Sequence, residues 1–223
     1  MAALLTLPAT AAASDGGTSG NSGGGATYTT APAGEISLTV ASGAWLGRAT
    51  RIRGRSEELS GRTVAIERRR SSGSEWVSVA SVRVGDDGRF ATKWTPAKTG
   101  RHQFRALPST ATSAGDANAQ AAASSVKRMT VYQSVTSTWY GPGFYGQRTA
   151  CGQRLTTTIL GVAHKTLPCG TKVALRANGR SIVVPVIDRG PYARGVTYDL
   201  TRETADRLGV MHTAQIGAAV LSR

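Results

Sequence analysis

Short stretches in which apolar and polar residues alternate recur through residues 34–133. Ile36–Val40, Thr63–Arg68 and Arg89–Trp94 show the pattern most clearly. Alternation with a period of two places the apolar side chains on one face of a β-strand. Further strands are expected at Ala49–Arg53, Glu75–Val79, Ser81–Val84, Gly100–Ala106 and Lys127–Tyr132. About seven short strands separated by turns predict a β-sandwich.

Residues 134–223 also predict short strands, with one helix among them. The expected strands are Thr136–Tyr140, Ile159–Ala163, Lys172–Arg176, Ser181–Ile187 and Gly217–Leu221. The run at Ser181–Ile187 is almost continuously apolar, which is typical of a strand buried on both faces. The helix has Thr201 as its N-cap, an apolar face at Ala205 and Leu208, and Gly209 at its end. The chain is therefore predicted to be all-β with one short helix.

Two segments precede the predicted sandwich. Residues 1–13 resemble the apolar end of a secretory signal peptide with an Ala-x-Ala pattern, although a basic segment is missing before it. Residues 14–33 are rich in Gly, Ser and Thr, which predicts a flexible linker. We therefore expect a sandwich domain over 34–133, a second domain over 134–223, and export from the cell. No run is long enough for a transmembrane segment.

Positive charge is spread over both predicted domains, and the net charge is +14. Residues 31–133 carry +8 and residues 134–223 carry +7. Such a field attracts a polyanion: nucleic acid, anionic lipid or an anionic cell-wall polymer. Export and the lack of a nucleic-acid motif argue against nucleic acid. The Arg68–Arg70 run is interpreted as a solvated strand end, and His102 as a packed or surface strand residue.

The two cysteines, Cys151 and Cys169, both lie in the second domain. An even number of cysteines in an exported chain predicts one disulfide, with two buried thiols as the alternative. The bond would close a loop with a separation of 18 residues, which is worth about 3 kcal/mol in the chain-entropy model. Two cysteines with few histidines nearby make a poor zinc site. No metal and no cofactor are expected.

Three residues that can move protons stand in motifs bounded by Gly and Pro. His164 lies in Ala-His-Lys-Thr-Leu-Pro, Asp188 in Ile-Asp-Arg-Gly-Pro and Asp199 in Tyr-Asp-Leu-Thr. Each also has a structural interpretation. Asp188 could pair with Arg189 or Arg194, Asp199 could interact with the helix dipole, and His164 could be a buried hydrogen-bonded residue.

Several motifs in this part of the chain together resemble a known family. They are Ser137–Gly141, Ala150–Gly152, Ala163–Pro168, Gly170–Val173, Asn178–Arg180, Ile187–Pro191 and Tyr198–Thr201. In this order and spacing the last 90 or so residues resemble the rare lipoprotein A (RlpA)-like double-psi β-barrel. Similar barrels occur in expansins, barwin-like proteins and family-45 endoglucanases. In the first domain, Asp86–Phe90 and the turns after it resemble the later half of bacterial immunoglobulin-like (Ig-like) domains.

The resemblance implies a six-stranded double-psi β-barrel with a groove that takes a polysaccharide. Enzymatic members are lytic transglycosylases of bacterial peptidoglycan. They cleave the β-1,4 bond from N-acetylmuramic acid to N-acetylglucosamine without water and leave a 1,6-anhydro sugar. The family's functional His and two Asp residues fall on His164, Asp188 and Asp199. Thr201 replaces the usual Ser, Cys169 stands where Phe is common, and the peptidoglycan-binding repeat of many septal members is missing.

The chemistry is consistent with one acid that works twice. A lytic enzyme needs a carboxyl group that protonates the leaving oxygen and then accepts the proton of the sugar's own 6-hydroxyl. Such a group needs a raised pKa, from burial or from a second carboxylate. Asp188 and Asp199 could face each other across a groove, with His164 orienting the carboxyl or the substrate, and the sequence leaves open which Asp carries the proton.

Aromatic and basic residues near these motifs are candidates for sugar binding, because aromatic faces suit the apolar faces of pyranose rings. The predicted substrate-binding residues are Tyr140, Tyr145, Arg189 and Tyr192. The main hypothesis is a secreted, cell-wall-associated, monomeric lytic transglycosylase that acts on peptidoglycan strands. The alternative is an expansin-like module that grips glycan without cutting it. Nucleic-acid binding is the third and weakest hypothesis.

Overall fold

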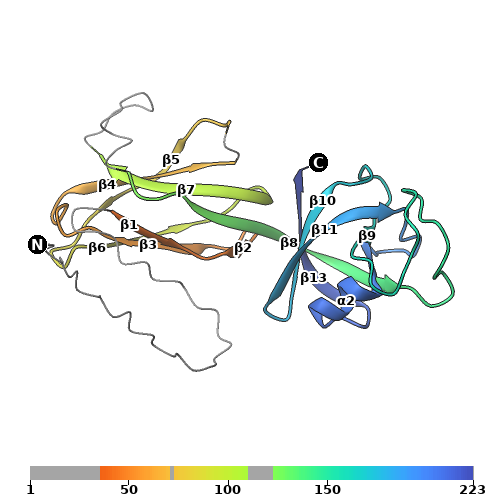
Figure 1. Ribbon diagram of the computed structural model, residues 1–223. Coiled ribbons are helices and arrows are strands. Elements are labelled where there is room, and N and C mark those ends of the chain that lie inside the picture. Colours follow the sequence, from red (N-terminus) through yellow and green to blue (C-terminus); the bar gives the residue numbers. More distant parts are fainter. Residues whose placement is uncertain (1–35, 71–72, 110–122, 223) are drawn as a thin grey trace, which may run out of the picture.

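The computed structural model describes residues 36–70, 73–109 and 123–222. The leader expected over 1–13 and the linker expected over 14–33 lie outside these residues. Two β-rich domains follow one another, and the long strand β8 (Lys127–Tyr140) passes from the first into the second (Figure 1). Among the described residues, no helix has the length and apolar character to cross a membrane.

The first domain has two sheets packed around one core. One sheet has the order β1-β3-β6, and the other has the order β5-β4-β7-β8 with β2 beside β8. The strands are β1 (Ser37–Val40), β2 (Gly43–Trp45), β3 (Thr50–Arg55), β4 (Thr63–Arg69), β5 (Val77–Arg83), β6 (Arg89–Trp94) and β7 (Gly100–Pro108). Ile52 and Phe90 from one sheet and Val64 and Phe104 from the other are buried in the core. The architecture agrees with the predicted β-sandwich, and the Ig-like resemblance stays a prediction.

The expected strands Glu75–Val79 and Ser81–Val84 form a single strand, β5. Ile66 of β4 pairs with Ala80, whereas the next residue, Glu67, pairs with Ser78. One extra residue therefore stands in β5 at this point, which is a β-bulge. The bulge shifts the alternation by one residue, and the shift in the sequence pattern looks like a break between two strands.

β8 is also one strand where two were expected, and the expected domain boundary between 133 and 134 falls inside it. Its first part pairs with β7 and β2, and its second part pairs with β12 and β13. Exposed Gln133 and Ser134 stand between the two cores. Polar residues at this point interrupt the hydrophobic pattern without interrupting the strand, because each domain supplies its own pairing partners.

The second domain is a closed barrel of six strands. The order is β12-β9-β11-β10-β13-β8, and pairing of β12 with β8 closes it. The remaining strands are β9 (Val162–Ala163), β10 (Lys172–Ala177), β11 (Arg180–Asp188), β12 (Tyr198–Thr201) and β13 (Ala214–Ser222). The inward side chains pack with the single described helix, α2 (Arg202–Leu208). The predicted all-β fold with a six-stranded barrel is confirmed.

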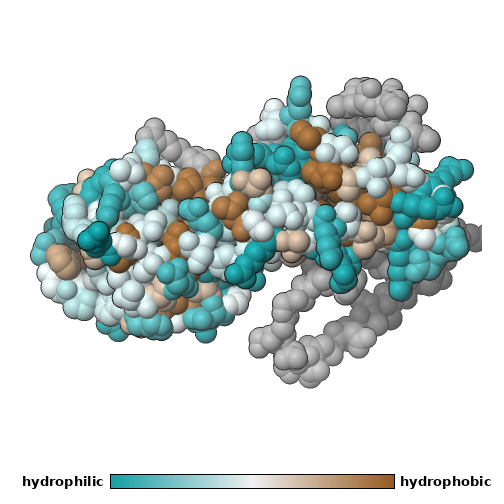
Figure 2. All heavy atoms as spheres, turned by 180° about the vertical axis from the view of Figure 1, so that it is seen from behind, coloured by the Kyte–Doolittle hydropathy of each residue, from teal (hydrophilic) through white to brown (hydrophobic). Residues whose placement is uncertain are grey.

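Local signals predicted the ends of α2 correctly. The Thr201 side chain accepts a hydrogen bond from the Thr204 N–H, and Gly209 ends the helix with φ +68°. Two expectations about strands were wrong. β9 has only two residues where five were expected, and Val183 in β11 is 46% exposed, because one side of this barrel strand faces solvent. In the view from behind, hydrophilic side chains surround small apolar patches on both domains (Figure 2).

Candidate active site

The short strand β9 brings the two aspartates together. β9 lies between β11 and β12, and Ala163 pairs with Asp188 on one side and with Asp199 on the other. Residues opposite one another on adjacent strands project from the same face of a sheet. With strands about 4.8 Å apart, the two aspartate Cα atoms are separated by about 10 Å. Two acids that are distant along the chain thus share one face of the barrel.

Backbone amides hold Asp188. Its Oδ1 accepts hydrogen bonds from the N–H groups of Ala150 and Arg189, both at 2.8 Å. Two N–H donors on one oxygen stabilise the negative charge of the carboxylate. Within the described residues, Asp188 forms no ion pair with Arg189 or Arg194. The Tyr140 phenol also interacts with the Asp188 carboxylate.

Asp199 lies in a different electrostatic environment from Asp188. Its side chain is half-buried, and its Oδ1 accepts a 2.7 Å hydrogen bond from the Thr138 hydroxyl, which lies directly opposite on β8. Burial, followed by the negative charge of Asp188, raises the pKa of Asp199, although the Thr138 hydrogen bond opposes the shift. The N-cap of α2 is Thr201, so Asp199 does not cap the helix. This carboxyl group therefore holds its proton more tightly than an ordinary aspartic acid.

Tyr140 lies beside both acids at the end of β8. Burial, and then the charges of Asp188 and Asp199, raise the pKa of its phenol far above the usual value. No hydrogen bond of normal geometry reaches the buried hydroxyl within the described part of the chain. The phenol is therefore a neutral O–H donor next to the carboxylates, and its interaction with the Asp188 side chain adds to the rise in its pKa.

His164 follows Ala163, the residue that pairs with both acids, but the His164 ring is held by hydrogen bonds within its own loop. Nδ1 accepts hydrogen bonds from the N–H groups of Thr166 (3.2 Å) and Leu167 (3.0 Å). An accepting Nδ1 places the proton of the neutral ring on Nε2. Burial, followed by the charges of Arg189 and Lys165, lowers the pKa of His164. Nε2 has no partner among the described residues.

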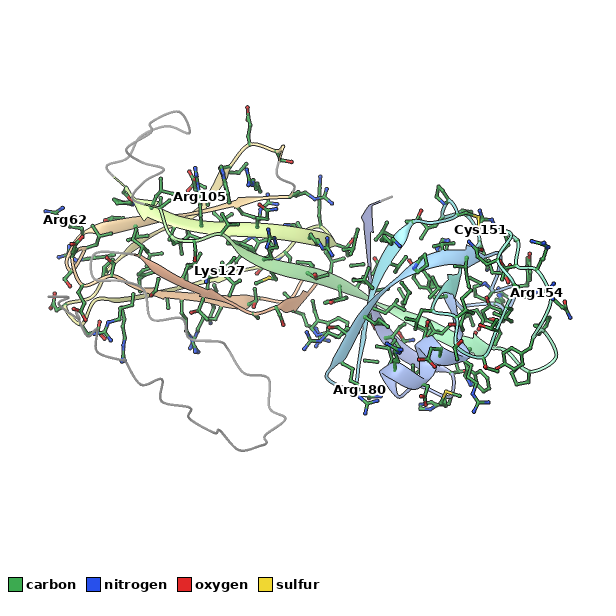
Figure 3. All side chains as sticks on the ribbon, viewed as in Figure 1. Arg62, Arg105, Lys127, Cys151, Arg154 and Arg180 are labelled. Carbon is green, nitrogen blue, oxygen red and sulfur yellow. A yellow bond between two sulfur atoms is a disulfide. The ribbon has the colours of Figure 1, made fainter. Side chains whose placement is uncertain are left out.

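Arg189 and the disulfide hold the same loop. Arg189 Nη1 donates to the carbonyl of Leu167 at 3.0 Å, and Nη2 lies 3.4 Å from Cys169 Sγ. The predicted disulfide between Cys151 and Cys169 is formed. It joins this loop to the segment whose Ala150 N–H contacts Asp188. Figure 3 shows Cys151 at the end of the barrel that points away from the sandwich.

The aromatic residues around the site, the predicted tyrosines and their neighbour Phe144, differ in how exposed they are. The Tyr192 side chain is 86% exposed in the loop after Asp188, and Phe144 is 54% exposed. The Phe144 ring is 6.4 Å from the Tyr140 ring, edge to face. Tyr145 is only partly exposed, and its buried hydroxyl lies over Gly141 without a hydrogen bond. Tyr192 and Phe144 therefore offer open faces, whereas Tyr145 is largely packed.

Three contributors were missed by sequence reasoning. Thr138 binds Asp199, Ala150 binds Asp188 through its backbone, and the Tyr198 ring packs 4.9 Å from the His164 ring. All three lie within motifs that carry the family resemblance, but the motifs do not reveal these contacts, because each contact depends on which strands and loops become neighbours. Over the residues that the structure describes, no group of three or more His, Cys, Asp or Glu is placed to hold a metal.

Comparisons with known proteins cover this barrel. Residues 132–219 match a family model described as lytic transglycolase. A Synechocystis protein named "Probable endolytic peptidoglycan transglycosylase RlpA" is 41% identical over 102 residues, or 45% of this chain and 30% of that protein. The Aquifex aeolicus protein of the same name is 39% identical over 93 residues, or 41% of each chain. An endolytic peptidoglycan transglycosylase RlpA of Rickettsia felis is 40% identical over 77 residues, or 32% of this chain and 34% of that protein.

One solved structure, the Streptomyces papain inhibitor, covers 40% of this chain and 94% of its own, with 24% identity and a TM-score of 0.34. The chain spans less than half the length of the curated relatives described above. The family-model match over residues 132–219 falls on the six-stranded barrel with its histidine and aspartate motifs. The second domain of this chain is a double-psi β-barrel of the RlpA-like family.

Proposed function

We propose that the barrel is a lytic transglycosylase domain that acts on peptidoglycan at the cell wall, outside the cytoplasm. It would cleave the β-1,4 bond from N-acetylmuramic acid to N-acetylglucosamine. The pairing of Ala163 with both Asp188 and Asp199 carries the proposal, because it puts two carboxyl groups on one face. The transglycosylase names of the relatives support the same reaction class.

The two carboxyl groups would have different roles. Asp199 has a raised pKa and a free second oxygen, so it is suited to hold and deliver a proton. Asp188 accepts two backbone N–H groups, so its carboxylate is held in a fixed position. A fixed negative charge near the anomeric carbon would stabilise an oxocarbenium-like transition state.

The reaction needs no water. Asp199 gives its proton to the glycosidic oxygen as the bond from that oxygen to C1 of N-acetylmuramic acid breaks. The 6-hydroxyl oxygen of the same sugar then bonds to C1, and its proton passes to the Asp199 carboxylate. The products are a free 4-hydroxyl on N-acetylglucosamine and a 1,6-anhydro end, and the acid is regenerated.

The remaining residues would bind and position the substrate. His164 Nε2–H is a donor without a partner among the described residues, so it can donate to a sugar oxygen. The Tyr140 hydroxyl lies beside Asp188 without a hydrogen bond of normal geometry and can do the same. The exposed rings of Tyr192 and Phe144 can stack on pyranose faces. Arg189, which was predicted to bind substrate, would act as a positioning residue, because its guanidinium binds Leu167 and Cys169 of the loop.

The test uses purified glycan strands and mass spectrometry of the released fragments. The wild-type chain should produce 1,6-anhydromuramyl ends. Asp199→Asn should lower the rate about 1,000-fold, within the range for loss of a general acid, and Asp188→Asn should lower it by a smaller factor. Asp206→Asn is the matched control, because Asp206 is exposed on α2.

Three outcomes would contradict the proposal. Full activity of Asp199→Asn would remove its role as the acid. A larger loss for Asp188→Asn than for Asp199→Asn would reverse the assignment of the two roles. Binding of glycan by the wild-type chain without any anhydro product would favour the expansin-like alternative.

A further inference from the structure

A row of basic side chains covers the outer face of the three-stranded sheet of the sandwich. Strand β3 presents Arg51, Arg53 and Arg55 at alternate positions, and β6 presents Arg89 and Lys93. Arg51 lies opposite Lys93, and Arg55 lies opposite Arg89. All five are exposed. They are called the basic face below, and Figure 1 shows this sheet as one layer of the sandwich.

Few acids neutralise the basic face. Arg55 pairs with Glu57 at 2.7 Å, and Arg89 lies 3.8 Å from Asp87. Arg51, Arg53 and Lys93 form no ion pair with any residue that the structure describes. Like charges opposite one another on neighbouring strands destabilise a sheet. The fold therefore gains nothing from this arrangement.

Other cations of the same domain serve the fold. Arg68 Nη1 lies 3.1 Å from His102 Nδ1, Arg70 donates to the Thr99 carbonyl at 3.2 Å, and Arg105 pairs with Glu67 at 2.8 Å. The Arg68–Arg70 run, the most obvious basic motif in the sequence, is thus engaged within the sandwich. It is less solvated than expected, and its guanidinium groups are less available to a partner than those of the basic face.

We propose that the basic face binds a phosphodiester polymer of the cell wall, in which phosphates are joined by short polyol units. Alternate residues on β3 place the three arginines about 7 Å apart along the strand. A phosphodiester chain presents its charges at a comparable interval. The guanidinium fork matches the oxygens of a phosphate in a bidentate manner.

The neighbouring side chains distinguish this partner from nucleic acid. Ser37 lies opposite Arg55, Thr39 opposite Arg53, and Ala91 opposite Arg53 on the other side. These side chains are small, and no aromatic residue stands at these outward positions. Single-stranded nucleic acids bind through aromatic stacking platforms as well as charge. A flat face of cations and small residues suits a polymer with a phosphate backbone and no bases.

The experiment measures binding of the full chain to synthetic poly(glycerol phosphate) at several salt concentrations. The test variant is Arg51→Gln, Arg53→Gln, Lys93→Gln, which removes the three unpaired charges. We expect its affinity to fall about tenfold or more, and the slope of log K against log salt to decrease by about 1 for each lost phosphate contact. The variant should fold, because the inward residues of β3 and β6 are unchanged.

The matched control is Arg83→Gln, Arg101→Gln, Arg128→Gln. These residues are exposed on β5, β7 and β8 of the other sheet, so the control loses the same net charge. It should bind almost like the wild-type chain. Asp199→Asn should also bind normally, so this test can fail or succeed independently of the proposed catalytic function.

Four results would overturn the proposal. The first is the absence of any saturable binding by the wild-type chain at low salt. The control variant could lose as much affinity as the test variant, which would mean that net charge alone decides. Single-stranded DNA of equal charge could bind as tightly as poly(glycerol phosphate). A neutral chito-oligosaccharide could bind with the same affinity and the same dependence on the three residues.

Discussion

His102 in the sandwich and His164 in the barrel both lie in β-rich segments, but they differ in how many of their ring nitrogens form hydrogen bonds. Both ring nitrogens of His102 have partners, Arg68 at Nδ1 and the Lys98 carbonyl at Nε2, and the ring is 1% exposed. His164 uses only Nδ1, and its Nε2 has no partner among the described residues. Burial is the main cause of a lowered pKa in both cases.

The acids of the two domains repeat the contrast. Glu67 pairs with Arg105 at 2.8 Å, and both side chains are largely buried. Asp199 engages one oxygen and leaves the other without a protein partner in the described structure. Asp188 forms no ion pair there and is bound only by two backbone N–H groups and the Tyr140 phenol. Buried polar groups in a framework are normally satisfied. The candidate site therefore differs from the core in its unused hydrogen-bonding capacity, and not in the types of residue that it contains.

Removal of the disulfide is expected to have the largest effect and to affect the barrel alone, because only the barrel contains cysteines. Cys151→Ser, Cys169→Ser frees a loop with a separation of 18 residues, and should lower the free energy of unfolding of the barrel by about 3 kcal/mol. Catalytic activity should fall as well, because the Ala150 N–H that binds Asp188 is adjacent to Cys151. Denaturant unfolding and product release measure the two effects.

Reductant is the control for this variant. Dithiothreitol should shift the wild-type chain toward the behaviour of the double variant and leave the double variant unchanged. Equal stability of the two chains would mean that hydrogen bonds such as those of Arg189 hold the loop without the covalent link.

The two histidines should give opposite results when each is replaced by asparagine. His164→Asn keeps an acceptor near the Nδ1 position and removes the Nε2 donor, so the fold should persist while activity falls about 100-fold. His102→Asn leaves a gap beside Trp94, whose ring is 5.3 Å from the imidazole. It should lower stability by about 2 kcal/mol with little change in activity once the chain is folded.

The measurements are thermal unfolding and the rate of anhydro product formation for both variants. His164→Gln is a further control, because its amide can reach toward the Nε2 position. If both histidine variants lost stability and kept activity, His164 would be a framework residue like His102, and the contrast between the two domains would fail at this position.

Sequence patterns predicted those features that depend on a few neighbouring residues. The Thr201 cap and the Gly209 stop follow from local propensity. The registry that places Asp188 and Asp199 on either side of Ala163 involves strands that are distant along the chain. The sequence therefore indicated candidate residues, whose roles stay predictions, but not their partners.

Long-range packing also explains why some predictions from the sequence differ from the structure. Exposed Gln133 and Ser134 resemble a boundary in the sequence, but β8 continues through them because both domains offer pairing strands. The direction of the Arg189 guanidinium depends on where the Leu167 carbonyl lies. Neither arrangement leaves a periodic signal in the sequence.

The pH dependence of stability should show the contrast as two effects of opposite sign. The folded-state pKa values of His102 and His164 are lowered, so below about pH 6.5 the unfolded chain binds protons that the folded chain does not. Stability should therefore fall as the pH decreases through this window. The pKa of Asp199 is raised, so protonation near and above pH 4 should stabilise the folded state.

Urea unfolding at a series of pH values measures both effects. His102→Asn and His164→Asn should each remove part of the decline below neutral pH, and Asp199→Asn should remove the opposite effect at acidic pH. A decline that persists unchanged in a chain lacking both histidines would assign it to other groups.

The smallest expected effect comes from Thr138→Val, which removes the hydroxyl that contacts Asp199 Oδ1 at 2.7 Å. This hydrogen bond lowers the pKa of Asp199, so the variant should raise it further. If Asp199 must be protonated to act as the acid, the alkaline limb of the kcat/KM profile moves to higher pH. The maximal rate should fall only several-fold, because the acid stays in place but loses one contact.

Thr138→Ser is the matched control, since it keeps the hydroxyl and should restore the wild-type profile. A structural defect would lower the rate equally at every pH, whereas loss of this hydrogen bond moves the limb. If the limb stays in place in Thr138→Val while the fold is intact, the group that titrates is not Asp199. The general acid would then be another group of the site, and Asp188→Asn is the next variant to test, because the backbone donors at Ala150 and Arg189 are not affected by the Thr138 substitution.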